Sequence, residues 1–350
     1  MIARDGKRWI PRVGVVLLAT LLAGCITLKD EGAKSGRLIG TWVDDFIGFN
    51  DPKYIAAMEQ FNLFEVFTDS SWTEPCNECW NFTRTDGLFG VALAKHGVAK
   101  GRFFFNADDT PDYLKSLTTA QLREELKNHI QTFMRRYPFV RIWQVMNEPI
   151  GQDAAGSFVI KNNVFKQKLG ADWIREALRF AYEADPTATF IAVNEFNADG
   201  LNAKADKLYS YYKNTLVGAI PSAKLAVGLQ MHLDPCAGGF RSPPASEIER
   251  NMKRFAHLGI QVQITEMDYA IRCLPGTQAQ KLASQTAMYH DIVAACYRLA
   301  ACTAFSTWGI GDKDSWIRTV NGHYDWPLLF DDAYLPKPAF QGVVDALNGR

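Results

Sequence analysis

The sequence predicts a (β/α)8 barrel, an α/β fold in which eight parallel strands alternate with helices in a single domain. Short apolar runs alternate with amphipathic segments along most of the 350-residue chain, the pattern of repeated βα units. Two of these runs end in a carboxylate, Glu148 and Glu266, and functional groups in such barrels lie at the carboxyl ends of strands. One barrel of this kind accounts for a chain of this length.

The apolar runs give eight expected strands. They cover Leu38–Val43, Leu63–Thr68, Lys100–Asn106, Arg141–Met146, Thr189–Asn194, Leu225–His232, Gln261–Thr265 and Thr303–Trp308. Amphipathic segments between them predict helices, among them Thr119–Tyr137, Phe165–Ala184, Ser246–Leu258 and Gln278–Leu299. An open doubly wound sheet is the alternative, but no glycine-rich dinucleotide fingerprint follows the first strand.

The N-terminal residues predict an export signal. A cationic segment precedes the apolar run Val13–Ala23, and Leu21-Leu22-Ala23-Gly24-Cys25 resembles the bacterial lipobox, in which Cys25 becomes the lipidated N-terminus. We therefore expect a signal peptide over residues 1–24, a lipidated tether over 25–36 and the barrel over 37–350. The protein would be an exported bacterial lipoprotein, held at the periplasmic or cell-surface side of a membrane. The alternative is a plain signal peptide or short anchor in which the cysteine is incidental.

The composition argues against nucleic acid as a partner. Lys plus Arg and Asp plus Glu both total 38, so the net charge is zero and there is no basic excess. Most of the 9 tryptophans are expected in the core, and a cleft that stacks sugar rings on indoles would use a surplus of them.

Six cysteines remain beside Cys25, an even number that in an exported protein predicts disulfides. Cys76 and Cys79 form a CxxC pair, for which a loop disulfide is favoured over a redox or metal pair because no second CxxC and no nearby His supports zinc. Cys236 and Cys273 follow neighbouring strands and could bridge two loops. Cys296 and Cys302 lie between a helix and a strand.

A pair of carboxylates at one barrel mouth indicates cleavage of a glycosidic bond, one carboxyl donating a proton and the other attacking as the nucleophile. Gln230 and His232 are two residues apart and face the same way on one strand, and Glu266 and Asp268 are two apart on the next. A cluster of Glu266, His232 and Asp268 would satisfy these polar groups and keep Glu266 ionised. A structural polar network is the alternative role for His232.

The run Trp143–Pro149 resembles the acid/base segment of glycoside hydrolase family 10, the xylanase family. Further segments resemble motifs of that family in the same order, namely Val193–Asn197, Gly228–Leu233, Thr265–Asp268, Trp308–Trp316 and Pro327–Phe340. The resemblance covers roughly residues 37 to 348. Several motifs in the family's order are strong evidence, whereas Asn-Glu-Pro alone occurs in many related barrels.

The resemblance implies a role for each matching residue. Glu148 matches the acid/base and Glu266 the nucleophile of a retaining enzyme that needs no metal or organic cofactor, with the two carboxyl groups ~5–5.5 Å apart. Residues around the scissile sugar are matched by Asn147, Gln230 and His232. Trp308 and Trp316 follow the eighth expected strand, and aromatic rings at that mouth suit sugar stacking, although isolated tryptophans are more often core residues. Asn194 and Asp268 are expected to support the site. Cys296 and Cys302 occupy the place of a disulfide common in the family.

The N-terminal half departs from the family's pattern on the side that binds the non-reducing sugars. Phe67, Thr68, Ser71 and Ala107 stand where the family carries Glu, Asn, Lys and His, and of that segment only Trp72 remains. We expect an endo-1,4-β-xylanase-like hydrolase of β-1,4-linked polysaccharides. The alternatives are a related hydrolase with a different β-glycoside as substrate, because these glycone-side residues are altered, and a non-catalytic glycan-binding lipoprotein.

Overall fold

The computed structural model describes residues 27–43, 51–68, 73–102, 104–235, 237, 242–321 and 324–350. The predicted signal peptide and Cys25 lie outside these residues. Within them, no helix combines the length and the apolar character needed to cross a membrane.

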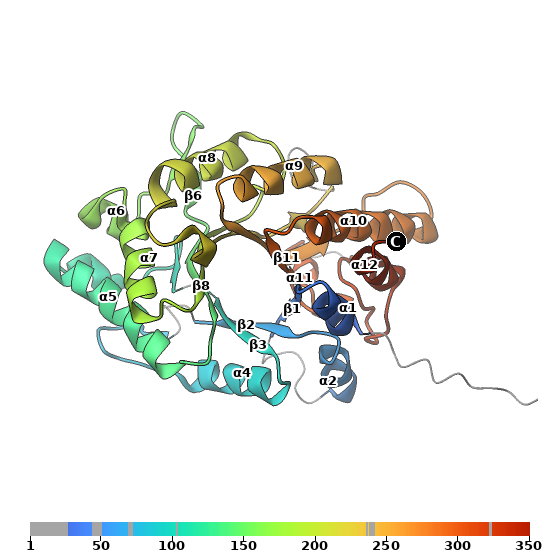
Figure 1. The fold of residues 1–350 in the computed structure, drawn as a ribbon, viewed down its shortest axis with the longest axis horizontal. Helices are drawn as coiled ribbons and strands as arrows, with labels where there is room; N and C mark the ends of the chain where they lie inside the picture. The colour runs from blue at the N-terminus through green and yellow to red at the C-terminus, as the bar shows by residue number, and fades with distance from the viewer. Residues whose placement is uncertain are drawn as a thin grey trace, which may run out of the picture.

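In the described part of the chain, parallel strands close into a barrel, and the predicted fold is confirmed. The hydrogen-bonded order is β1-β2-β3-β5-β8-β9-β11-β12, and β12 pairs with β1 to complete the ring. Figure 1 looks into this ring and shows the helices arranged around its outside. The barrel strands are β1 Leu38–Trp42, β2 Leu63–Phe67, β3 Val98–Arg102, β5 Ile142–Asn147, β8 Thr189–Glu195, β9 Leu225–Leu229, β11 Gln261–Tyr269 and β12 Cys302–Thr307.

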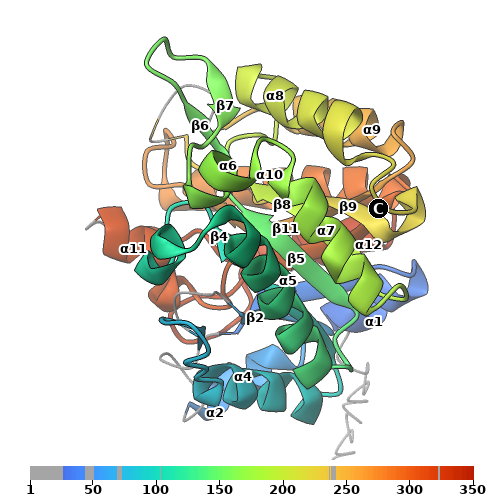
Figure 2. The same cartoon turned by 90° about the vertical axis from the view of Figure 1, so that its left-hand side faces the viewer.

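Short strands extend the barrel at its mouth. β4 continues the line of β3, β10 pairs with the end of β11, and β6 and β7 form an antiparallel hairpin. In Figure 2 the β6–β7 hairpin, β4 and α11 lie toward the same end of the molecule. The bounds are β4 Phe105–Asn106, β6 Ile150–Gln152, β7 Phe158–Ile160 and β10 His232–Leu233.

The helices form the outer layer. Their bounds are α1 Leu28–Lys34, α2 Pro52–Met58, α4 Thr83–Ala94, α5 Thr119–Arg136, α6 Val164–Leu169, α7 Trp173–Ala184, α8 Ala203–Tyr211, α9 Ala245–Ala256, α10 Gln278–Arg298, α11 Trp316–Asn321 and α12 Pro338–Leu347. Thr118 and Gln121 start α5 with reciprocal capping bonds, which satisfy backbone donors that a helix start leaves open.

Four predicted segments differ from the structure. The strand expected over Leu225–His232 divides into β9 and β10. The helix expected over Phe165–Ala184 divides into α6 and α7, because Gly170 ends α6 with a φ of 92°, a conformation that glycine adopts without strain. The strand expected over Lys100–Asn106 divides into β3 and β4. Part of the predicted tether is the helix α1, whose Leu28 is fully buried in the main core; burial of this apolar side chain stabilises the helix against the barrel.

Polar groups occupy the inside of the barrel beneath its mouth. Lys100 Nζ lies 2.8 Å from Glu65 Oε1, and both side chains are fully buried. A charge in this position is tolerated only when it is paired. Outside the strands, aromatic rings fill the layer under the helices, as where Trp143 stacks on Phe104 at 5.0 Å between centroids. The rigid barrel therefore fixes the strand ends that carry the site.

Candidate active site

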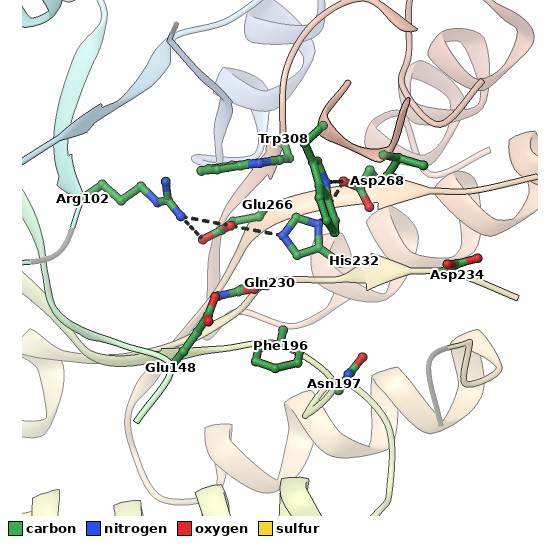
Figure 3. Close-up of a pocket in the computed structure, with 12 residues that line it drawn as sticks. Arg102, Glu148, Phe196, Asn197, Gln230, His232, Asp234, Glu266, Asp268 and Trp308 are labelled. Atoms are coloured by element: carbon green, nitrogen blue, oxygen red, sulfur yellow. Dashed lines mark hydrogen bonds and ion pairs between the residues drawn. The ribbon is translucent and has the colours of Figure 1, made fainter. Parts of the chain in front are cut away.

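The carboxyl ends of the strands bring the predicted site residues together. Glu266 and Asp268 lie on β11, His232 on β10, Asn147 on β5 and Asn194 on β8. Glu266, Asp268 and His232 line a cavity of about 480 Å³, within the size range of small-molecule sites, and Figure 3 shows the labelled side chains around it. Asn147 and Asn194 are buried beside it and hydrogen-bond the lining residues Gln230 and Glu266. The cavity is lined by Arg102, Glu148, Phe196, Asn197, Gln230, His232, Asp234, Glu266, Asp268, Trp308, Trp316 and Ile317.

Glu266 is a buried carboxylate held by three side chains. Asn194 Nδ2 lies 2.6 Å from Oε1, His232 Nε2 lies 3.2 Å from Oε2, and Arg102 Nη2 lies 3.4 Å from each oxygen. Burial alone would raise the pKa of Glu266, but the charge of Arg102 and the charge and hydrogen bond of His232, together with Asn194, lower this pKa to about 2. The group is therefore ionised near neutral pH, as a nucleophile must be.

His232 links the two carboxylates of β11. Its Nδ1 lies 2.9 Å from Asp268 Oδ2, and the indole Nε1 of Trp316 donates to the same oxygen at 2.7 Å. Burial lowers the pKa of His232, but Asp268 and Glu266 outweigh it and raise this pKa to about 10. Both ring nitrogens of the charged imidazole can then donate, one to each carboxylate.

Glu148 sits at the end of β5 in an unusual backbone conformation. Its φ is 51°, in the left-handed region that non-glycine residues rarely occupy. The Glu148 backbone N–H donates to the Asn194 carbonyl at 2.9 Å, and Gln230 Nε2 donates to Glu148 Oε1 at 3.0 Å. These bonds aim a half-buried carboxyl group into the cavity, from a different strand than Glu266.

Asn147 lies between the two glutamates. Its Oδ1 accepts hydrogen bonds from Asn194 Nδ2 at 3.1 Å, from Gln230 Nε2 at 3.3 Å and from Gln144 Nε2 at 3.2 Å. Asn194 also binds Glu266, and Gln230 also binds Glu148. One chain of amides therefore fixes Glu148 and Glu266 relative to each other, while the Asn147 amide oxygen is fully used within the protein.

The two predicted aromatic residues have different surroundings. The Trp308 ring stacks on Trp42 at 4.6 Å with 12° between planes, contacts the Arg102 guanidinium at 3.9 Å, and is only 8% exposed. Trp316 is half-buried and its ring meets His232 edge-on at 5.1 Å. Both line the cavity, and Trp316 has more ring surface left for a ligand.

Arg102 is a site residue that the sequence analysis missed. It is the last residue of β3, two positions after Lys100, so both cations point to the inside of the barrel. The guanidinium lies 4.5 Å from the Phe67 ring centroid and 3.9 Å from that of Trp308. The available signal was the spacing of two basic residues in a buried strand, where an unpaired charge would be costly.

The residues at the altered glycone-side positions have different surroundings in the structure. Phe67 borders the cavity wall through its contact with Arg102 and packs on Trp42 at 5.7 Å. Thr68 is buried and its hydroxyl donates to the Arg102 carbonyl at 2.7 Å, so it supports the end of β3. Ala107 is buried in the core. Ser71 and Trp72 lie outside the described residues.

Two predicted disulfides are confirmed, Cys76–Cys79 and Cys296–Cys302. Cys273 is also disulfide-bonded, whereas Cys236, the residue expected to pair with it, lies outside the described residues. The described part of the chain contains no cluster of three or more His, Cys, Asp or Glu side chains arranged to hold a metal ion.

Known proteins with similar sequences and structures fall in one family. The sequence matches glycosyl hydrolase family 10 over residues 27–346. An endo-1,4-beta-xylanase of Agaricus bisporus is 29% identical over 341 residues, which span 95% of this chain and 98% of that protein. The crystal structure of xylanase 10B from Thermotoga petrophila with xylobiose is 28% identical with a TM-score of 0.82, covering 93% of this chain and 98% of that one.

A second solved structure, xylanase 10C of Cellvibrio japonicus in complex with xylopentaose, is 26% identical with a TM-score of 0.82. It covers 92% of this chain and 69% of that one. The family match extends over nearly the whole sequence, and the barrel carries its polar site at the expected mouth. This chain is a glycoside hydrolase and belongs to glycosyl hydrolase family 10.

Proposed function

We propose that this protein is a retaining endo-1,4-β-xylanase-like hydrolase in which Glu266 is the nucleophile and Glu148 the acid/base. The observation that carries the proposal is the chain of amides joining these two carboxyl groups across one cavity. A retaining glycosidase requires two carboxyl groups at a fixed short separation, one ionised and one able to donate a proton.

In the first step, a carboxylate oxygen of Glu266 attacks the anomeric carbon of the sugar. The bond from that carbon to the leaving oxygen breaks, and Glu148 gives its proton to that oxygen. The product is a glycosyl ester of Glu266 and a shortened chain with a free hydroxyl. Because the low pKa of Glu266 keeps its carboxylate ionised, no proton has to leave this group before the attack.

In the second step, water attacks the same carbon from the side of Glu148. The Glu148 carboxylate takes a proton from the water, the ester bond breaks, and its electron pair returns to Glu266. Two inversions at one carbon give net retention of configuration. The bond that Gln230 donates to Glu148 keeps this carboxyl group in place through both steps.

Asn147 is the group we assign to the 2-hydroxyl of the reacting sugar. Its oxygen is occupied by three donors from the protein, so its amide nitrogen is directed away from them and can donate to a substrate oxygen. A hydrogen bond at this hydroxyl strengthens as positive charge develops on the sugar ring. His232, Gln230 and Trp316 complete the wall of the sugar site.

Xylan is the substrate we propose, because relatives named endo-1,4-beta-xylanase match nearly the full chain and solved relatives hold xylobiose and xylopentaose. A different β-1,4-glycan is the second candidate. It is favoured by Arg102, which lines the cavity and packs on Phe67, one of the altered glycone-side positions. We also propose that Cys25 carries a lipid anchor outside the cytoplasm, on the strength of the lipobox-like run before it.

The test is product release from a panel of β-1,4-linked glycans, xylan included, by the protein lacking residues 1–25. Glu266→Ala should abolish release, and Glu183→Ala, an exposed position on α7, should leave it unchanged. Proton NMR of the first product should show the β-anomer before mutarotation. An α-anomer would contradict the retaining mechanism. Cleavage of a glycan other than xylan alone would replace xylan as the proposed substrate. Binding without cleavage would favour a non-catalytic glycan-binding protein.

A further inference from the structure

Arg102 meets the nucleophile rather than open solvent. Its Nη2 is equidistant from the two oxygens of Glu266, at 3.4 Å each, and its side chain is only 6% exposed. The guanidinium is held by the rings of Phe67 and Trp308 at 4.5 and 3.9 Å. Aromatic contacts of this kind fix a cation in place and exclude water. In Figure 3, Arg102 and His232 approach the Glu266 carboxylate from two sides.

The charges around Glu266 are balanced. The cations Arg102, His232 and Lys100 face the carboxyl groups of Glu266, Asp268 and Glu65, as the ion pairs at 2.8 to 3.4 Å record. Among the described residues, each of these three cations is therefore already paired with a carboxyl group. Arg102 forms an ion pair with the reacting carboxylate, and the low local dielectric strengthens this interaction.

This interaction changes in size during the reaction. It is largest when Glu266 is a carboxylate, before the attack and after the ester breaks, and smallest when Glu266 is a neutral glycosyl ester. A group that favours the carboxylate over the ester makes Glu266 a weaker nucleophile and a better leaving group. It also places positive charge near a sugar ring that becomes positive in both steps, so this repulsion slows both and leaves their ratio to the effect on Glu266.

On the basis of the function proposed above, we propose that Arg102 is a positioning residue that makes Glu266 the better leaving group and so sets the balance between the two half-reactions. It speeds cleavage of the glycosyl ester relative to its formation. His232 has the same preference for the carboxylate, but it also holds Asp268, so a change at His232 would disturb two carboxylates of β11 at once. The Arg102 guanidinium lies on the other side of Glu266 and pairs with its carboxylate.

The variants separate this role from structural support. Arg102→Gln keeps a planar polar group without charge, Arg102→Met keeps the aliphatic stem, and Arg102→Lys restores the charge. Arg37→Gln is the control, because Arg37 binds the carbonyls of Tyr297 and Leu299 and lines no part of the cavity. Thermal unfolding of each variant shows whether the fold is retained, and if Arg102→Gln does not fold, the Met and Lys variants provide the comparison.

The measurement is stopped-flow kinetics with 2,4-dinitrophenyl β-xylobioside, whose leaving group needs no proton. In Arg102→Gln the ratio of ester formation to ester cleavage should rise about tenfold, the effect of a shift of one pKa unit in the leaving carboxylate. A burst of one dinitrophenolate per active site would report it. Arg102→Lys should restore the ratio in part, and Arg37→Gln should match the wild type. Equal slowing of both steps would overturn the proposal, as would a change confined to KM.

The pH dependence of kcat/KM gives a second readout. The described charged and titratable groups around Glu266 are Arg102, His232, Lys100, Glu65, Asp268 and Glu148, and only the first is changed. The acid limb, set by Glu266 at about 2 in the wild type, should move toward 4.5, its ordinary value, in Arg102→Gln. An acid limb at the same pH in Arg102→Gln and in the wild type would count against the proposal.

The proposed function is checked separately in the wild type. A 2-deoxy-2-fluoro analogue of the same glycoside should leave its label on Glu266 in a peptide mass map. Absence of the label would overturn the nucleophile assignment, and with it the role of Arg102. A label on Glu266 together with an unchanged half-reaction ratio in Arg102→Gln would overturn the role of Arg102 alone.

Discussion

Asn194 Nδ2 lies 2.6 Å from Oε1 of Glu266, the shortest of the contacts to this carboxylate. Thr265 orients the amide by donating to Asn194 Oδ1 at 2.6 Å, and the same Nδ2 reaches Asn147. The proposed nucleophile is therefore held from β8, β10 and β3, by Asn194, His232 and Arg102. The neutral amide of Asn194 fixes its position as the two cations do.

Asn194→Ala should lower kcat/KM about 10- to 100-fold, because a hydrogen bond to a charged group contributes ~1.5–3 kcal/mol. Asn194→Asp should lower it further by adding a negative charge beside Glu266. Initial rates on the best substrate of the glycan panel check both. Full activity in Asn194→Ala would show that Arg102 and His232 are sufficient to hold the carboxylate.

Glu148→Ala should lose activity on polysaccharide but retain ester formation on a 2,4-dinitrophenyl glycoside. A proton donor is needed only when the leaving oxygen is a poor leaving group, and general acid catalysis contributes about 10²–10⁴-fold. The measurement compares rates across aryl glycosides of graded leaving-group pKa. Equal losses on all of them would contradict the role of Glu148 as acid.

His232 should stabilise the fold in a pH-dependent way. Its pKa is raised from 6.5 to about 10 by Asp268 and Glu266, against the effect of burial. A raised histidine pKa gives stability that is complete below 6.5 and is lost as the pH rises toward 10. In His232→Asn the free energy of unfolding should fall by on the order of 3 kcal/mol at low pH. Urea unfolding across the pH range should show wild type and variant converging, and a constant difference would contradict the assigned charge.

The Cys296–Cys302 disulfide joins the end of α10 to the start of β12, and both residues are buried. Replacing both with Ala should lower the free energy of unfolding by about 2 kcal/mol for a loop of this length, with a further loss from the buried volume. Cys76 and Cys79 are exposed, so the matching double variant lacks the second loss. Denaturant unfolding of the two double variants checks this prediction. Equal losses in free energy of unfolding would contradict a packing contribution from the buried pair.

The sequence predicted the strands well because each is a short apolar run with polar groups at its exit, as in Arg141–Met146 and Gln261–Thr265. These are local patterns, and the barrel then brings the exits together. Helix α1 was not predicted, because a short polar-looking segment becomes helical only through the burial of Leu28 against distant elements. The start of α5 depends on neighbouring residues only, because Thr118 and Gln121 cap it reciprocally.

The place of Arg102 in the site could not be predicted from the sequence for a different reason. Its partner Glu266 is 164 residues away on a strand that does not pair with β3, so the contact depends on the reach of two side chains across the barrel. No run of neighbouring residues encodes that distance. Most of the amide network had local signals, since Gln230, Asn194 and Asn147 each lie near a strand exit.

The left-handed backbone of Glu148 has a consequence for what this chain must retain. A side chain at a φ of 51° destabilises the fold by ~1–2 kcal/mol relative to glycine, so Glu148→Gly should unfold at higher denaturant than Glu148→Ala. A lineage that needed only to hold a glycan would gain stability by accepting that glycine. Glutamate at this position thus lowers the stability of the fold, and a glycine there would be expected in a descendant that had ceased to hydrolyse its substrate.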